Sequence, residues 1–110
     1  MYEVIKTLEI SAAHSLSLPY LSKCTNLHGH NWRVTVFLRA QEINENGMIM
    51  DFTEIKRKIE DKLDHKIINN VVSFNPTAEN LAKFICDELA PLCYRVEVEE
   101  SRDNKAVYYV

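Results

Sequence analysis

The chain has 110 residues, of which 46% are hydrophobic and 26% charged, and its formal net charge is −3. This size and composition predict one soluble globular domain over residues 1–110. The mildly acidic balance and the lack of a Lys/Arg cluster argue against nucleic-acid binding, and no apolar run reaches the roughly 18 residues of a membrane span. We expect no signal peptide, and three cysteines in no framework spacing favour free thiols in a reducing, cytoplasmic compartment.

Two segments with alternating apolar and polar residues, 2–13 and 28–40, are predicted to be strands. In the first, the even-numbered positions are mostly apolar, and His14 continues that face. Residues 15–26 are mostly polar and are expected to form the loop that joins the two strands.

His28 and His30 open the second strand and are separated only by Gly29. A two-residue spacing in a strand points both imidazoles to the same face, and glycine lets another group come close to the backbone. If the two strands pair antiparallel, His14 leaves the sheet beside the end where His28 and His30 enter it. A single histidine on an apolar face is usually a hydrogen-bonded core residue, but three that converge, with one position left for water or substrate, are typical of catalytic zinc. The sequence therefore predicts a Zn²⁺ site formed by His14, His28 and His30.

The second half of the chain is predicted to contribute two helices and two strands. Asp51 is expected to cap the first helix, which ends around residues 63–66, and Thr77 to cap the second, which Pro91 stops. The expected apolar stripe of the first helix consists of Phe52, Ile55, Ile59 and Leu63. Strands at residues 94–101 and 106–110 follow, joined by a polar turn at residues 102–105. The order β-β-α-α-β-β predicts an α+β domain whose antiparallel sheet is covered on one face by two helices.

Cys24 lies in the predicted loop, four residues before His28. The other cysteines, Cys86 and Cys93, are expected to be buried and inert. Cys24 differs because a loop position beside a cation favours the reactive thiolate. It could instead be a fourth zinc ligand, and the sequence leaves both interpretations open.

Two further segments carry carboxylates of interest. Asp64 and His65 close the first helix, where the imidazole either interacts with the helix dipole or acts as a general acid–base oriented by the carboxylate. Glu100 shares its alternation with Val96 and Val98, which directs it inward. A carboxylate in such a place needs a partner, for example the adjacent N–H donors of a guanidine-like heterocycle edge. The alternative is that the strand has ended or bulged by residue 100.

Six segments, in chain order, resemble a known family over nearly the whole chain: SAAHSL, C-x3-HGHNW, MIMDF, LDH, NPTAEN and EES. The family is that of 6-pyruvoyl-tetrahydropterin synthase and 6-carboxy-tetrahydropterin synthase, and the Cys-x3-HGH spacing is more similar to the carboxy branch. The resemblance implies the T-fold, in which β-β-α-α-β-β subunits join edge to edge into trimeric barrels that stack as hexamers. Active sites then form where the subunits of the homo-oligomer meet.

The resemblance also implies roles for single residues. Zinc would bind His14, His28 and His30, Cys24 would be the catalytic thiol, Asp64 and His65 the proton-relay pair, and Glu100 and Thr77 substrate-binding residues. The implied enzyme is a lyase that converts 7,8-dihydroneopterin triphosphate to 6-carboxy-tetrahydropterin, acetaldehyde and triphosphate, for the synthesis of queuosine-type deazapurines.

Three alternatives remain at this point: a 6-pyruvoyl-tetrahydropterin synthase, a folate-pathway relative that cleaves dihydroneopterin, and a non-catalytic pterin-binding protein that retains zinc. Glu99, where relatives often have lysine, and the short loop before Cys24 depart from the family pattern and bear on substrate preference.

Overall fold

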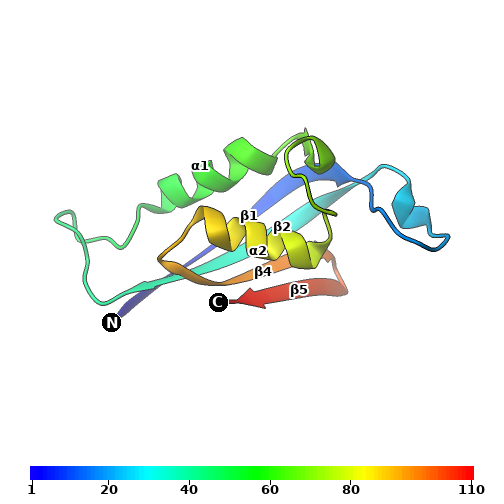
Figure 1. Ribbon diagram of the computed structural model, residues 1–110. Helices are drawn as coiled ribbons and strands as arrows, with labels where there is room; N and C mark the ends of the chain where they lie inside the picture. The colour runs from blue at the N-terminus through cyan, green and yellow to red at the C-terminus, as the bar shows by residue number, and fades with distance from the viewer.

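The computed structural model describes residues 1–110 and consists of a five-stranded sheet with two helices on one face (Figure 1). The elements in chain order are β1 (Tyr2–His14), η1 (Lys23–Thr25), β2 (His28–Ala40), α1 (Phe52–Leu63), β3 (Lys66–Ile67), η2 (Ile68–Asn70), α2 (Ala78–Glu88), β4 (Cys93–Ser101) and β5 (Asn104–Tyr109). This confirms the predicted α+β arrangement. Neither helix has the length and apolar character needed to cross a bilayer.

The strands lie in the order β3-β1-β2-β4-β5, and every neighbouring pair is antiparallel except β1 and β3. β1 and β2 pair along their whole length, from Tyr2 opposite Ala40 to His14 opposite His28. The sheet is antiparallel as predicted except for β3, a strand that the prediction did not include, in which Lys66 and Ile67 pair in parallel with β1. A strand of two residues is too short to produce an alternating pattern in the sequence.

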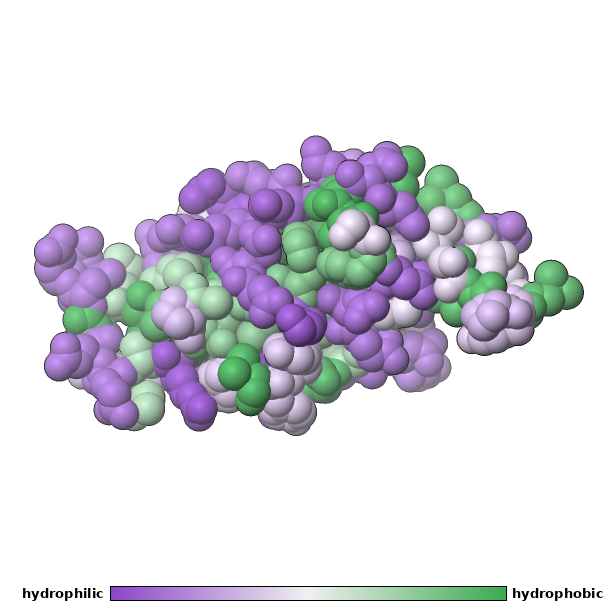
Figure 2. Space-filling model, in the orientation of Figure 1, coloured by the Kyte–Doolittle hydropathy of each residue, from purple (hydrophilic) through white to green (hydrophobic).

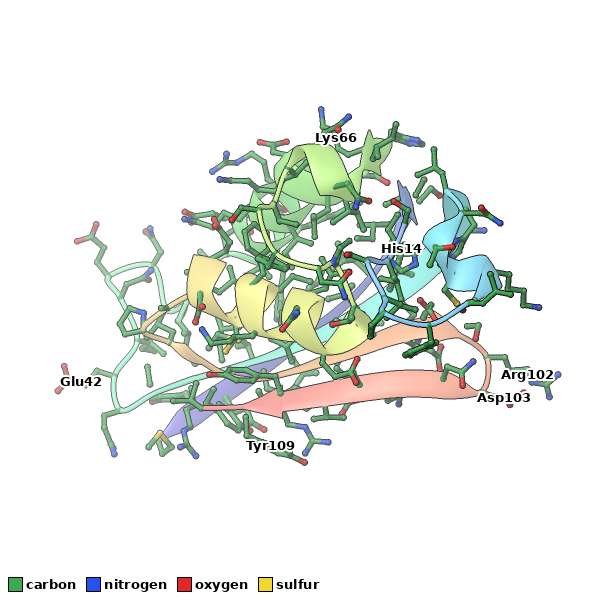
Figure 3. All side chains as sticks on the ribbon, turned by 45° about the vertical axis from the view of Figure 1, so that its right-hand side comes forward. His14, Glu42, Lys66, Arg102, Asp103 and Tyr109 are labelled. Carbon is green, nitrogen blue, oxygen red and sulfur yellow. The ribbon has the colours of Figure 1, made fainter.

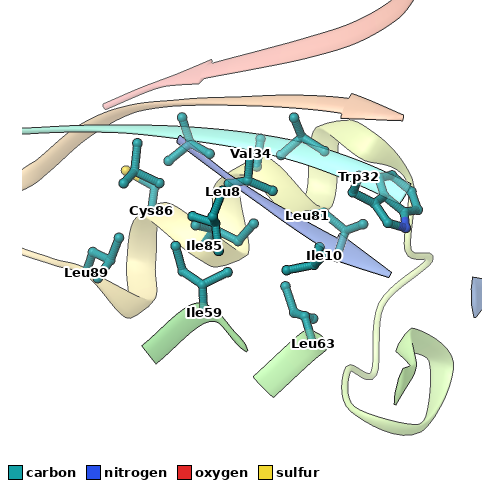
Figure 4. Close-up of a cluster of buried hydrophobic side chains, with 14 of the residues drawn as sticks. Leu8, Ile10, Trp32, Val34, Ile59, Leu63, Leu81, Ile85, Cys86 and Leu89 are labelled. Carbon is teal, nitrogen blue, oxygen red and sulfur yellow. The ribbon is translucent and has the colours of Figure 1, made fainter. Parts of the chain in front are cut away.

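The core lies between the helices and the sheet and contains 19 buried hydrophobic residues (Figure 4). The alternating apolar positions of β1 and β2 face the helices, which present side chains at helical spacing. From α1 these are Ile55, Ile59 and Leu63, and from α2 they are Leu81, Ala82, Ile85 and Cys86. The assignment of Phe52 to this stripe was wrong: it is 48% exposed because it lies in the first turn and lines a shallow groove with Tyr2 and Met48.

Both helices begin at the predicted N-cap residues. Asp51 Oδ1 accepts a hydrogen bond from Thr53 N at 2.8 Å, and Thr77 Oγ1 accepts one from Asn80 N at 3.1 Å, so each cap satisfies a free N–H of the first turn. The turn between β4 and β5 is shorter than predicted, because Asn104 already pairs with Ser101 and begins β5.

Candidate active site

The predicted zinc ligands lie at the end of the sheet where β1 stops and β2 starts. The register places His14 opposite His28 and Ala12 opposite His30, so the three imidazoles share the helix-facing side of two neighbouring strands. The ring centroid of His14 is 4.6 Å from that of His28 and 5.2 Å from that of His30. The structure therefore brings the three histidines together. Figure 3 shows that His14 lies at the same end of the molecule as Arg102 and Asp103 of the last turn, and Glu42 at the other end.

Hydrogen bonds to backbone carbonyls orient two of these rings. His14 Nδ1 lies 2.8 Å from the carbonyl oxygen of Pro76, and His28 Nδ1 lies 2.7 Å from that of Asn26. Because a carbonyl oxygen only accepts, each Nδ1 carries the proton and donates it. Each Nε2 of the neutral ring then holds a free lone pair, which is the arrangement found behind metal-binding histidines.

Glu100 completes a group of four possible ligands. Its Oε1 lies 3.2 Å from His14 Nε2 and 3.4 Å from His30 Nε2, yet both nitrogens are buried without a hydrogen-bond partner. A buried lone pair that faces a carboxylate oxygen is unfavourable unless a cation or proton lies between them. The ligand atoms of His14, His28, His30 and Glu100 all lie within 4.8 Å of one another, so the residues fit a divalent cation, and imidazole with carboxylate is a set that zinc accepts.

The protonation of His30 agrees with this role. Burial lowers the pKa of His30 below its ordinary value, and the neighbouring His14 and His28 lower it further, although Glu100 opposes them. The neutral ring is therefore favoured at neutral pH, and only the neutral ring binds a metal.

Trp32 supports the histidines from the core side, a role that strand alternation alone does not predict. Its side chain is fully buried, its Nε1 donates to Ala12 O at 3.1 Å, and its ring lies edge-on at 4.8 Å from His14 and 5.1 Å from His30. The available signal was its position two residues after His30, on the same face of the strand.

Cys24 lines one cavity of about 460 Å³ with three of the four possible ligands, His28, His30 and Glu100. The thiol is half-buried but does not belong to the four-residue ligand group, which favours its interpretation as a reactive thiol over that as a fourth ligand. Cys86 and Cys93 are buried, as expected for inert thiols, and burial raises the pKa of Cys86 to about 12.

A second cavity of about 680 Å³ adjoins the first, since Cys24 and Glu100 line both, and Thr77 lines this one as well. Both interpretations of Glu100 from the sequence hold in part. The ladder is irregular between Glu99 and Ser101, but the strand continues to Ser101 and the Glu100 side chain points inward to the histidines.

Asp64 and His65 lie elsewhere. His65 has a left-handed backbone, with φ of 58°, its N–H donates to Ser11 O at 2.7 Å, and Asp64 Oδ1 accepts from Ser11 N at 2.9 Å. His65 Nε2 lies 3.6 Å from Asp64 Oδ2, and the side chain of His65 is 82% exposed. His65 lines a cavity of about 500 Å³ that also includes Gly29 and His30 but is distinct from the cavity of Cys24. A single copy of the chain therefore does not place His65 and Cys24 in one cavity.

Known proteins resemble this chain over most of its length. The family model of 6-pyruvoyl tetrahydropterin synthase matches residues 3–110. A putative 6-carboxy-5,6,7,8-tetrahydropterin synthase of Archaeoglobus fulgidus is 40% identical over 102 residues, which cover 87% of this chain and 85% of the relative. The 6-pyruvoyl tetrahydrobiopterin synthase of Dictyostelium discoideum is 39% identical over 98 residues, which cover 78% of this chain and 73% of the relative.

Among solved structures, 6-pyruvoyl tetrahydropterin synthase of Caenorhabditis elegans superposes with a TM-score of 0.76 at 28% sequence identity and covers 99% of this chain and 95% of its own. This similarity identifies the five-stranded sheet and its two helices as a T-fold. The chain belongs to the 6-pyruvoyl tetrahydropterin synthase family.

Proposed function

We propose that the chain is a zinc-dependent 6-carboxy-5,6,7,8-tetrahydropterin synthase that converts 7,8-dihydroneopterin triphosphate and water to 6-carboxy-tetrahydropterin, acetaldehyde and triphosphate. The observation that carries the proposal is the cavity that Cys24 lines together with His28, His30 and Glu100. The name of the archaeal relative supports the carboxy branch. The product would serve the synthesis of queuosine-type deazapurine nucleosides, in a cytoplasm that keeps all three thiols free.

His14, His28 and His30 would hold the zinc ion through their Nε2 atoms, with Glu100 within reach. When bound, zinc supplies a Lewis acid that polarises oxygens of the substrate's side chain and acidifies the adjacent protons. The backbone carbonyls that accept from His14 and His28 keep both rings in the metal-binding tautomer.

Glu100 and Cys24 would act on the substrate itself. Glu100 lines both adjoining cavities, so its carboxylate can accept two hydrogen bonds from the amino-pyrimidine edge of the pterin. Thr77 lines the same second cavity. The Cys24 thiolate would then remove a proton from the side chain of the substrate, which leads to elimination of triphosphate.

The Asp64–His65 pair would move the proton on the opposite face of the substrate, with the imidazole as acid–base and the carboxylate as its orienting partner. Because His65 is exposed and lines a different cavity from Cys24 in the same copy, we infer that a neighbouring copy supplies it. The open edges of β3 and β5 offer the means, since unpaired strand edges favour pairing with another chain. A trimer or hexamer would complete the site.

A mass-spectrometric product assay of the zinc-loaded protein with 7,8-dihydroneopterin triphosphate tests the proposal. A 6-carboxy-tetrahydropterin product with acetaldehyde is expected. A 6-pyruvoyl product would instead assign the chain to the activity named for the Dictyostelium relative. Absence of any product, with zinc and a pterin bound, would reject catalysis. Cys24→Ala should retain zinc and lose turnover, and retained turnover would remove the thiol from the reaction.

A further inference from the structure

We propose that Asn69 and Asn75, here called the asparagine pair, are positioning residues that hold the Cys24 thiol in the cavity that it lines with His28 and His30. They would do so by fixing the backbone of residues 15–17, the first part of the loop that carries Cys24. The inference rests on the proposed function, in which Cys24 removes a proton from the substrate.

The loop needs such support because hydrophobic packing does not fix it. Residues 15–22 form no helix or strand, and none of their side chains is buried. Tyr20 is 64% exposed and Leu21 is fully exposed. Figure 2 shows hydrophobic side chains on the surface at this end of the molecule. A loop without buried anchors is held by its hydrogen bonds.

The asparagine pair makes four of these bonds, two to each of two serines. Asn69 Oδ1 accepts from Ser15 N at 2.9 Å, and Asn69 Nδ2 donates to Ser15 O at 2.9 Å. Asn75 repeats the pattern with Ser17, at 2.9 and 3.1 Å. A primary amide carries a donor and an acceptor side by side, so each asparagine binds the loop as a neighbouring strand would.

The residue between the two serines is tied to Cys24. The N–H of Leu16 donates to the backbone oxygen of Cys24 at 2.9 Å. Successive residues of an extended segment point their N–H groups to opposite sides, so those of Ser15 and Ser17 share one side and that of Leu16 points to the other. The asparagine pair therefore lies along one side of the segment and the backbone of Cys24 along the other.

Asn75 also connects the loop to the ligand group. Its backbone oxygen accepts from Asn80 Nδ2 at 2.9 Å and from Thr77 N at 2.8 Å, which fixes it to the start of α2. The next residue, Pro76, provides the carbonyl that orients His14. One short segment thus sets the position of a zinc-binding ring and, through Ser17, of the loop that carries the thiol.

Replacing Asn75 by Asp tests the inference, because the shape is kept while the donor becomes an oxygen that faces Ser17 O. We expect kcat to fall roughly ten- to hundredfold, the cost of a small misplacement of a catalytic group, with KM and zinc content little changed. Alkylation of Cys24 by iodoacetamide should become faster, since a loosened loop exposes a half-buried thiol. Asn69→Asp provides a second test at an exposed position.

Asn70→Asp is the matched control, since this exposed neighbour of Asn69 undergoes the same change of charge and contributes nothing to the four bonds. Turnover of Asn75→Asp equal to that of Asn70→Asp would overturn the inference, as would a loss of zinc that accounts for the whole loss of turnover. If the wild-type chain has no activity on the pterin, the proposed function fails by itself. The alkylation rates then still decide, because equal rates in the two variants would reject the positioning role.

Discussion

Under the proposed function, replacing His28 by Ala should remove most of the stabilisation by zinc while leaving the metal-free chain nearly as stable as before. His28 is half-buried and its one hydrogen bond goes to an exposed carbonyl, so its loss costs about 1 kcal/mol. Zinc at a thousandfold excess over its dissociation constant adds about 4 kcal/mol to the free energy of unfolding. At roughly 4 °C of Tm per kcal/mol for a chain of this size, the wild type should melt on the order of 15 °C higher with zinc than with a chelator.

The assay is thermal unfolding at one fixed protein concentration, because association of subunits also shifts Tm. Trp32, the only tryptophan, is a convenient probe, since its ring lies 4.8 Å from His14 and 5.1 Å from His30. In the His28→Ala variant the shift between zinc and chelator should shrink to a few degrees.

His65→Ala is the matched control, because it removes an imidazole that is 82% exposed and lies outside the ligand group. It should retain the full shift. A full shift in His28→Ala, or its loss in His65→Ala, would refute the assignment of the ligands.

Three further predictions concern thiols and stability. Iodoacetamide at pH 8.5 should modify Cys24 and spare Cys86, because burial raises the pKa of Cys86 to about 12. The thiolate fraction of Cys86 then stays well under one in a thousand and grows only as the pH rises. Peptide mass mapping measures which cysteine is modified. Trp32→Phe should lower the free energy of unfolding by about 2 kcal/mol in denaturant titration, since it leaves a gap and removes the donor to Ala12 O. Asp51→Ala should cost about 1 kcal/mol through loss of the α1 cap, whereas the exposed Asp61→Ala should cost less.

The pairing of the first two strands could be predicted from the sequence, and with it the histidine site. A period of two places His28 and His30 on one face, and a loop between consecutive strands brings His14 beside them. The observed register, with His14 opposite His28, is the direct result. No long-range information was needed, since strand alternation and chain connectivity are both local properties.

The features that the sequence could not reveal depend on contacts between distant segments. β3 exists because the residues after α1 meet β1, where Asp64 Oδ1 accepts from Ser11 N. The exposure of Phe52 follows from where α1 begins relative to the sheet. The bonds of the asparagine pair to Ser15 and Ser17 span more than fifty residues of chain. Polar side chains in loops follow no periodic pattern from which such bonds could be predicted.

The sequence indicates that Glu100 points inward, but only the structure shows which residues its carboxylate meets. Alternation with Val96 and Val98 predicts that direction, but only the structure places its Oε1 3.2 Å from His14 Nε2. While Oε1 stays at that place, only Oε2 is free toward a heterocycle in the adjoining cavity, so accepting one hydrogen bond on each oxygen requires the carboxylate to move. Four filled ligand positions are typical of structural zinc and three of catalytic zinc. Under the proposed function, a pterin that engages Glu100 would therefore draw it away from the histidines and open the position that catalysis requires.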